Sequence, residues 1–110
     1  MSELISSKGY DFLDMNLYVD EMGLDFEKDI RDYGTHVNIV GGEKITDWFE
    51  NYLQENYVNT GVVLTADHRG DKKYSSWDKA YELWESLCID AKEQVKYNIE
   101  NGIYYELETE

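Results

Sequence analysis

Residues 77–101 read WDKAYELWESLCIDAKEQVKYNIEN, and this stretch carries the strongest fold signal in the chain. Its apolar residues recur at steps of three and four, which places them on one stripe of a helix. Ser75 or Ser76 is a candidate N-cap, and Gly102 stands where a left-handed residue commonly ends a helix. The pattern predicts a helix over about 77–101. The stripe consists of Trp77, Ala80, Tyr81, Trp84, Leu87, Cys88, Ala91, Val95 and Ile99.

A second helix is predicted over about residues 43–56. Its apolar residues repeat the same helical spacing, and the pair Gly41-Gly42 precedes them as a break between elements. The polar residues between them fall on the opposite, solvent-facing side. The apolar stripe consists of Ile45, Trp48, Phe49, Tyr52 and Leu53.

Three short runs are typical of β-strands, because they are rich in β-branched or aromatic residues and each lies next to a glycine. They are residues 35–40 (THVNIV), 62–65 (VVLT) and 103–107 (IYYEL). Two helices combined with a small sheet of about three short strands define an α+β fold class. We therefore expect a small α+β domain.

The N-terminal third gives a weaker pattern. Residues 1–9 form a polar lead-in, and Gly23 separates two apolar segments between residues 10 and 33. Residues 15–19 (MNLYV) fit either a helix or a strand; we favour one or two short helices in this region. Because no linker-like run follows residue 9, residues 10–110 are interpreted as a single acidic domain.

Charge is the outlying feature of the composition. The 110 residues include 24 acidic and 10 basic side chains, for a formal net charge of −14. An apolar content of 42% is too high for a disordered acidic tail. Direct binding to nucleic acid or to an anionic membrane is disfavoured, because such binding depends on Lys and Arg. The natural complement is a basic surface on another protein.

The sequence favours a cytoplasmic location. Cys88 is the only cysteine, so an intramolecular disulfide cannot form, as is usual in reducing compartments. The first 20 residues lack the basic and apolar regions of a secretory signal. If the gene belongs to a phage, the corresponding compartment is the host cytoplasm. The oligomeric state is left open.

Most of the acidity falls in two blocks, residues 10–33 and 82–110, each with eight acids and two bases. On a helix, Asp25, Asp29 and Asp32 would share one face at about 5–6 Å spacing. On the last strand, Glu106 and Glu108 would point the same way, about 6.5–7 Å apart. We predict that these five carboxylates bind the partner.

Regular rows of carboxylates can imitate the phosphates of a nucleic acid. In composition the chain resembles the small acidic phage proteins that inhibit restriction enzymes or CRISPR nucleases. The resemblance implies a DNA mimic that blocks the nucleic-acid site of a defence nuclease. The alternative is an intracellular regulatory or antitoxin-like binding module, whose interface is apolar and aromatic and whose acidity serves solubility.

Catalysis is not predicted. The sequence contains no CxxC, HExxH or EF-hand pattern, so we expect neither a metal nor a cofactor. His68 lies in the polar loop Asp67-His68-Arg69, but no nucleophile is evident beside it, and a turn is the favoured interpretation. His36 is expected on the outer face of the 35–40 strand.

Overall fold

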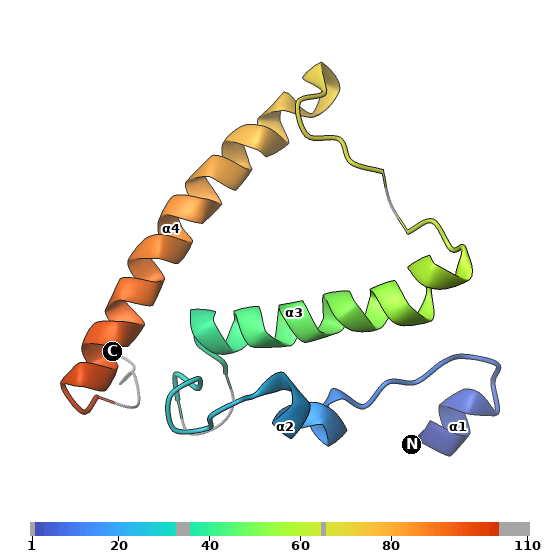
Figure 1. Ribbon diagram of the computed structural model, residues 1–110, viewed down its shortest axis with the longest axis horizontal. Helices are drawn as coiled ribbons and strands as arrows, with labels where there is room; N and C mark the ends of the chain where they lie inside the picture. Colours follow the sequence, from blue (N-terminus) through green and yellow to red (C-terminus); the bar gives the residue numbers. More distant parts are fainter. Residues whose placement is uncertain (1, 33–35, 65, 104–110) are drawn as a thin grey trace.

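Two long helices meet at one end and diverge, with a linker joining their far ends, so that they enclose a wedge (Figure 1). The computed structural model describes residues 2–32, 36–64 and 66–103. Short helical segments precede the two long helices in the chain. The α-helices are α1 (Ser2–Ser6), α2 (Val19–Met22), α3 (Ile39–Asn56) and α4 (Ser75–Glu100); the 3₁₀ turns are η1 (Met15–Tyr18), η2 (Val58–Thr60) and η3 (Lys72–Tyr74).

The helix predicted over 77–101 is confirmed as α4. It ends as the sequence indicates: Gly102 has a φ of 68°, and its N–H donates to the Ile99 carbonyl at 3.2 Å. The Ile103 N–H donates to the Asn98 carbonyl at 2.7 Å, which completes a Schellman motif. The predicted serine cap is wrong, because Ser75 and its neighbour lie inside the helix and Tyr74 occupies the N-cap position.

The helix predicted over 43–56 is also confirmed, but α3 begins four residues earlier, at Ile39. Asn38 is its N-cap: the side-chain oxygen accepts from the N–H groups of Val40 at 3.0 Å and Gly41 at 3.1 Å. The Gly-Gly pair therefore lies in the first turn of the helix and does not break it.

Position 41 requires a glycine because the backbone of another segment lies very close to its Cα, and not because its φ is unusual. A Cβ at this position would lie 2.5 Å from the backbone oxygen of Asp29, closer than a carbon can approach an oxygen. The next residue has open space, because a Cβ at Gly42 would meet nothing nearer than a Val37 methyl at 4.0 Å. Gly41 thus allows the loop before α3 to pack directly on the helix.

The α+β prediction is wrong, because the described ranges 2–32, 36–64 and 66–103 contain helices and no strand. Within 35–40, Asn38 turns the chain into α3, and one isolated antiparallel bridge pairs Ile30 with Val37. Residues 62–64 are outside any strand, as is Ile103. Residues 35, 65 and 104–107 of the predicted strands lie outside the described ranges.

In the N-terminal third, the helical interpretation of residues 15–19 is correct. These residues form η1 and the start of α2, and Gly23 ends α2 with a φ of 67°. The second helix expected before residue 33 is wrong, because residues 24–32 contain no helix. The polar lead-in contains the short helix α1, which has no buried residue.

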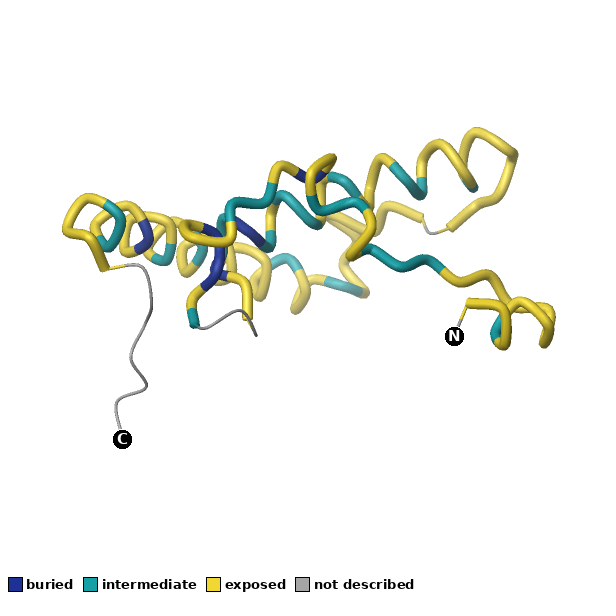
Figure 2. The backbone as a smooth tube through the Cα atoms, turned by 90° about the horizontal axis from the view of Figure 1, so that it is seen from below, coloured by how far each residue is buried: buried dark blue, intermediate teal, exposed yellow. Residues whose placement is uncertain are grey.

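The core is small and lies at the vertex of the wedge, where the loop before α3, the first turn of α3 and the last turns of α4 meet. The buried apolar residues are Met22, Ile30 and Val95, and Asp29 and Asn38 are buried beside them. Figure 2 shows how few segments of the chain are buried. Away from the vertex, Trp48 packs on Tyr18 with ring centroids 4.8 Å apart, which attaches α2 and η1 to α3.

The molecule is more open than a compact monomer of its length. Its radius of gyration is 17.8 Å, whereas about 13 Å is expected for a compact domain of this length. Its surface is 9316 Å², against about 6,300 Å² for a globular protein of this mass. A large part of the surface that a monomer would normally bury is therefore exposed.

Candidate binding surfaces

The predicted acidic face is not an aligned row in this structure. Residues 24–32 contain a turn, bends and one bridge residue and no helix, so Asp25, Asp29 and Asp32 are not aligned on a helix face. The other two predicted residues, Glu106 and Glu108, lie outside the described ranges. The three N-terminal carboxylates have separate local partners.

Asp29 is a structural residue, with 2% of its surface exposed. Its carboxylate accepts from the Asp25 N–H at 2.8 Å and from the Lys44 Nζ at 2.6 Å. Lys44 also donates to the Gly23 carbonyl at 2.9 Å. The Asp29 side chain thus ties the end of α2 and the following loop to α3, and it is not presented to a partner.

Asp25 and Asp32 are partly exposed and are each engaged by a neighbour. Lys28 lies 3.1 Å from the Asp25 carboxylate and lowers the pKa of Asp25 below its ordinary value. His36 Nδ1 lies 2.5 Å from the Asp32 carboxylate. His36 is exposed and belongs to a loop, so its predicted position on a strand is wrong.

A row of carboxylates does exist on α4, but its residues are not among the five that the sequence predicted to bind the partner. Helical geometry places the residues of the row within about 80° of one another, in a sector centred about 130° round the helix from the apolar stripe. Ile89 and Lys96 fall in the same sector. From first to last the acidic residues span about 33 Å at a rise of about 1.5 Å per residue. We call this set the α4 acidic row: Asp78, Glu82, Glu85, Glu93 and Glu100.

The row keeps most of its charge because, within the described residues, only Lys96 forms an ion pair with one of its carboxylates. Four lysine or arginine residues form ion pairs with acids outside the row. Within the described residues, no ion pair involves Glu82, Glu85 or Glu93, and Lys96 is 4.0 Å from Glu100. The Glu85 carboxylate raises the pKa of Tyr81 above its ordinary value by hydrogen bonding. The four pairs are Lys28–Asp25, Lys44–Asp29, Arg69–Asp67 and Lys92–Glu43.

The opposite face of α4 forms one wall of the wedge. Near the vertex the stripe is covered: Val95 is buried, and Cys88 and Ala91 are half-buried. Toward the start of the helix the same stripe is open, with Trp84 at 58% and Trp77 at 65% exposure. The predicted stripe is therefore confirmed as one face, but only its second half is packed within the chain.

The facing wall belongs to α3. Thr46 and Asp47 line an open hollow of about 700 Å³ together with Trp84 and Cys88 of α4. Thr46 also borders a second hollow of about 620 Å³, whose apolar lining includes Phe49 and Leu53. The wedge is thus an open apolar surface with acidic residues along its α3 side.

The polar loop around His68 lies beside the start of α4. The His68 ring is 4.4 Å from Tyr74, which is 5.1 Å from Trp77. Arg69 is bound to the Asp67 carboxylate and holds the pKa of Asp67 well below its ordinary value. His68 therefore contributes to an aromatic cluster that borders the open half of the apolar stripe.

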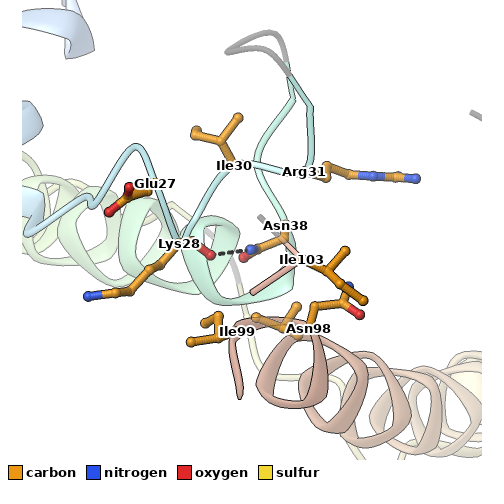
Figure 3. A pocket seen from close by; sticks show the side chains of 9 residues that line it. Glu27, Lys28, Ile30, Arg31, Asn38, Asn98, Ile99 and Ile103 are labelled. Carbon is orange, nitrogen blue, oxygen red and sulfur yellow. Dashed lines mark hydrogen bonds between the residues drawn. The ribbon is translucent and has the colours of Figure 1, made fainter. Parts of the chain in front are cut away.

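A crevice at the vertex is too small to hold a ligand (Figure 3). Its volume is about 10 Å³, which is room for about one water molecule. Asn38 crosses it and donates to the Lys28 carbonyl at 2.6 Å, as the dashed line in Figure 3 marks. Small-molecule sites occupy about 300–1,000 Å³, so the wedge is the larger candidate surface.

The described ranges contain neither a cluster of metal-ligating side chains nor a helix suited to cross a membrane. No group of three or more His, Cys, Asp or Glu side chains there is arranged to hold a metal ion. Nor does any helix in those ranges combine the length and apolar character needed to cross a membrane.

Comparison with protein families, curated proteins and solved structures gave no match. Function must therefore be inferred from the geometry of this chain.

The sequence did contain a signal for the α4 acidic row, because Asp78, Glu82 and Glu85 follow the i, i+4, i+7 spacing of a helix face. The separation of the wedge walls has no such signal, because it depends on how α3 and α4 cross.

Proposed function

We propose that this protein is a non-enzymatic, acidic inhibitor that binds the basic surface of a nucleic-acid-binding protein, such as a defence nuclease in a phage-infected cytoplasm. The single observation that carries the proposal is the α4 acidic row. It runs along one solvent-facing side of α4, and four of the ten Lys and Arg residues are paired with acids outside it. The partner would bind the row with the lysines and arginines that otherwise contact phosphates.

The dimensions of the row support nucleic-acid mimicry. Asp78, Glu82 and Glu85 follow i, i+4 and i, i+3 steps, which place neighbouring carboxylates about 5–6 Å apart. The steps to Glu93 and then to Glu100 are longer, about 12 and 10.5 Å along the helix. The total length of about 33 Å is close to one turn of B-DNA, which is about 34 Å. A positively charged groove that accepts one turn of duplex could therefore accept α4 along its outer face. The formal charge of −14 adds long-range attraction to such a groove.

The experiment is affinity capture from host lysate at about 0.15 M salt, repeated at about 1 M salt, where charges are screened within about 3 Å. We expect capture of a nucleic-acid-binding protein that elutes with salt and no longer binds DNA or RNA. Replacing Glu82, Glu85 and Glu93 together by Gln should abolish capture. The matched control replaces the exposed Glu3, Glu27 and Glu55 by Gln, with the same change in net charge. Equal loss with both triple variants would contradict a role for the row.

The exposed aromatic wall of α4 favours a second candidate function, a regulatory or antitoxin-like module that binds its partner in the wedge. Its interface would be apolar, so binding would resist salt. Capture that survives about 1 M salt and the triple Gln change, but is lost in Trp84→Glu, would favour this alternative over the acidic inhibitor.

A further inference from the structure

We propose that the wedge is closed by a second copy of this chain, in a two-fold symmetric dimer. In this dimer the start of α4 of each copy lies in the wedge of the other. The proposal goes beyond the function above, because it uses the apolar face of α4 and leaves the α4 acidic row facing outward on both copies.

The exposed area matches what a stable dimer needs. The surface of 9316 Å² exceeds that of a compact monomer of this mass by about 3,000 Å². Stable homodimers bury about 1,000–2,500 Å² per partner. A single docked helix from a foreign protein would cover only part of this excess, whereas a second copy with the same open wedge covers both walls.

The seam on α4 continues without interruption from the packed half to the open half. Steps of four and three residues lead from Val95 through Ala91, Cys88 and Trp84 to Tyr81. The first four of these residues line a hollow together with α3. This 4-3 spacing is the pattern with which helices pack against one another along a seam. The open half therefore has the pattern of a helix-packing surface, and nothing within the described residues covers it.

The charges beside the two surfaces are complementary between copies. On α3, Asp47 and Glu50 border the hollows of the wedge, and neither belongs to an ion pair of the described residues. Just before α4, Lys72 and Lys73 are exposed and likewise form no such pair. The Lys73 Nζ lies 5.5 Å from the centre of the Tyr74 ring, which packs on Trp77. In a two-fold arrangement each lysine end meets the α3 wall of the other copy, and the contact occurs twice. This pairing provides a local attraction that offsets the repulsion between two acidic chains.

A charge-swap experiment on the full chain tests the arrangement. Variant A carries Asp47→Lys with Glu50→Lys, and variant B carries Lys72→Glu with Lys73→Glu. Each change places like charges at both contacts of its own homodimer. In the mixed A–B dimer, the native lysines of A meet the native α3 acids of B. At the other contact, the introduced acids of B meet the introduced α3 lysines of A, so opposite charges meet at both contacts. We expect a dissociation constant raised at least about tenfold for A alone and for B alone, and restored in the equimolar mixture.

The measured quantity is the molar mass in solution, determined by light scattering at about 100 μM protein and again after dilution. A dimer with a micromolar dissociation constant dissociates on dilution. The wild-type chain should have twice the single-chain mass of 13.0 kDa. Trp84→Glu should be monomeric, whereas Ile89→Glu, at similar exposure but about 140° round the helix, should remain dimeric. A monomeric wild type, or weakened A and B homodimers that the mixture does not rescue, overturns the proposal. Capture of a nuclease through the α4 acidic row would be unaffected by either result.

Discussion

At the residue scale, the structural roles of Asp29 and Gly41 follow from one close contact between them. The amino-acid composition gives no indication of these roles. Asp29 is one of 24 acidic residues, yet it is buried and bonded to Lys44 and to the Asp25 N–H. Its backbone oxygen occupies the space where a side chain at Gly41 would begin. Asp29 thus positions the loop, and Gly41 leaves room for it.

The two adjacent glycines should respond in opposite ways to the same substitution. Gly41→Ala forces the loop away from α3 and should lower the free energy of unfolding by about 1–3 kcal/mol. Gly42→Ala meets no steric conflict and should raise it by up to about 1 kcal/mol through helix propensity. Urea unfolding followed by circular dichroism measures both. A Gly41→Ala variant as stable as Gly42→Ala would mean that the loop does not pack on the first turn.

At the element scale, the joint between α3 and α4 includes an ion pair whose strength depends on pH. Lys92 Nζ lies 2.5 Å from the Glu43 carboxylate, and both side chains are about half exposed. This hydrogen bond raises the pKa of Lys92 above its ordinary value near 10.5. Because the pair sits at the vertex, it helps to hold the crossing of the two helices.

The sign of the pH effect follows from the raised pKa. Folding favours protonated Lys92, so the stabilisation is complete below about pH 10.5 and is lost as pH rises through the folded-state value. We expect the melting temperature of the wild type to fall more steeply above pH 10.5 than that of Glu43→Gln. Thermal melts of both proteins between pH 8 and pH 12 test this expectation, since tyrosine ionisation affects the two alike. Parallel pH profiles would show that the pair does not form in solution.

At the scale of the whole molecule, the small core and the open wedge indicate that a single chain is only marginally stable. Of the described residues, three apolar ones are buried, while the aromatic residues at the start of α4 remain exposed to solvent. Exposed apolar patches of this kind are typical of surfaces that another chain covers. Stability should therefore be shared between the fold of the chain and its association.

Association makes stability depend on protein concentration. If the dimer buries the wedge, the melting temperature of the wild type should rise with concentration, because mass action favours the folded dimer. The melting temperature of Trp84→Glu should be lower and independent of concentration. Circular dichroism melts at about 1 and 100 μM make the comparison. A concentration-independent wild-type melt would argue that the open wedge belongs to a stable monomer.

The sequence by itself determined the helices that depend on local spacing. The period of the apolar stripe in α4, the left-handed Gly102 that ends it, and the apolar spacing of α3 are all properties of neighbouring residues, so they could be predicted. The carboxylate spacing of Glu82 and Glu85 was equally local, although the predicted face was placed on other residues.

Only the tertiary structure decided where α3 begins and that Asp29 is buried. It also decided that residues 36–40, the described part of the predicted 35–40 strand, do not form a strand. The run THVNIV has strand propensity, but Asn38 caps a helix whose first turn is held against the Asp29 loop. Such contacts join residues distant in the chain, and their free energy exceeds a local preference of about 1 kcal/mol or less. The angle between the two long helices, which leaves half of the α4 stripe open, likewise follows from packing at the vertex.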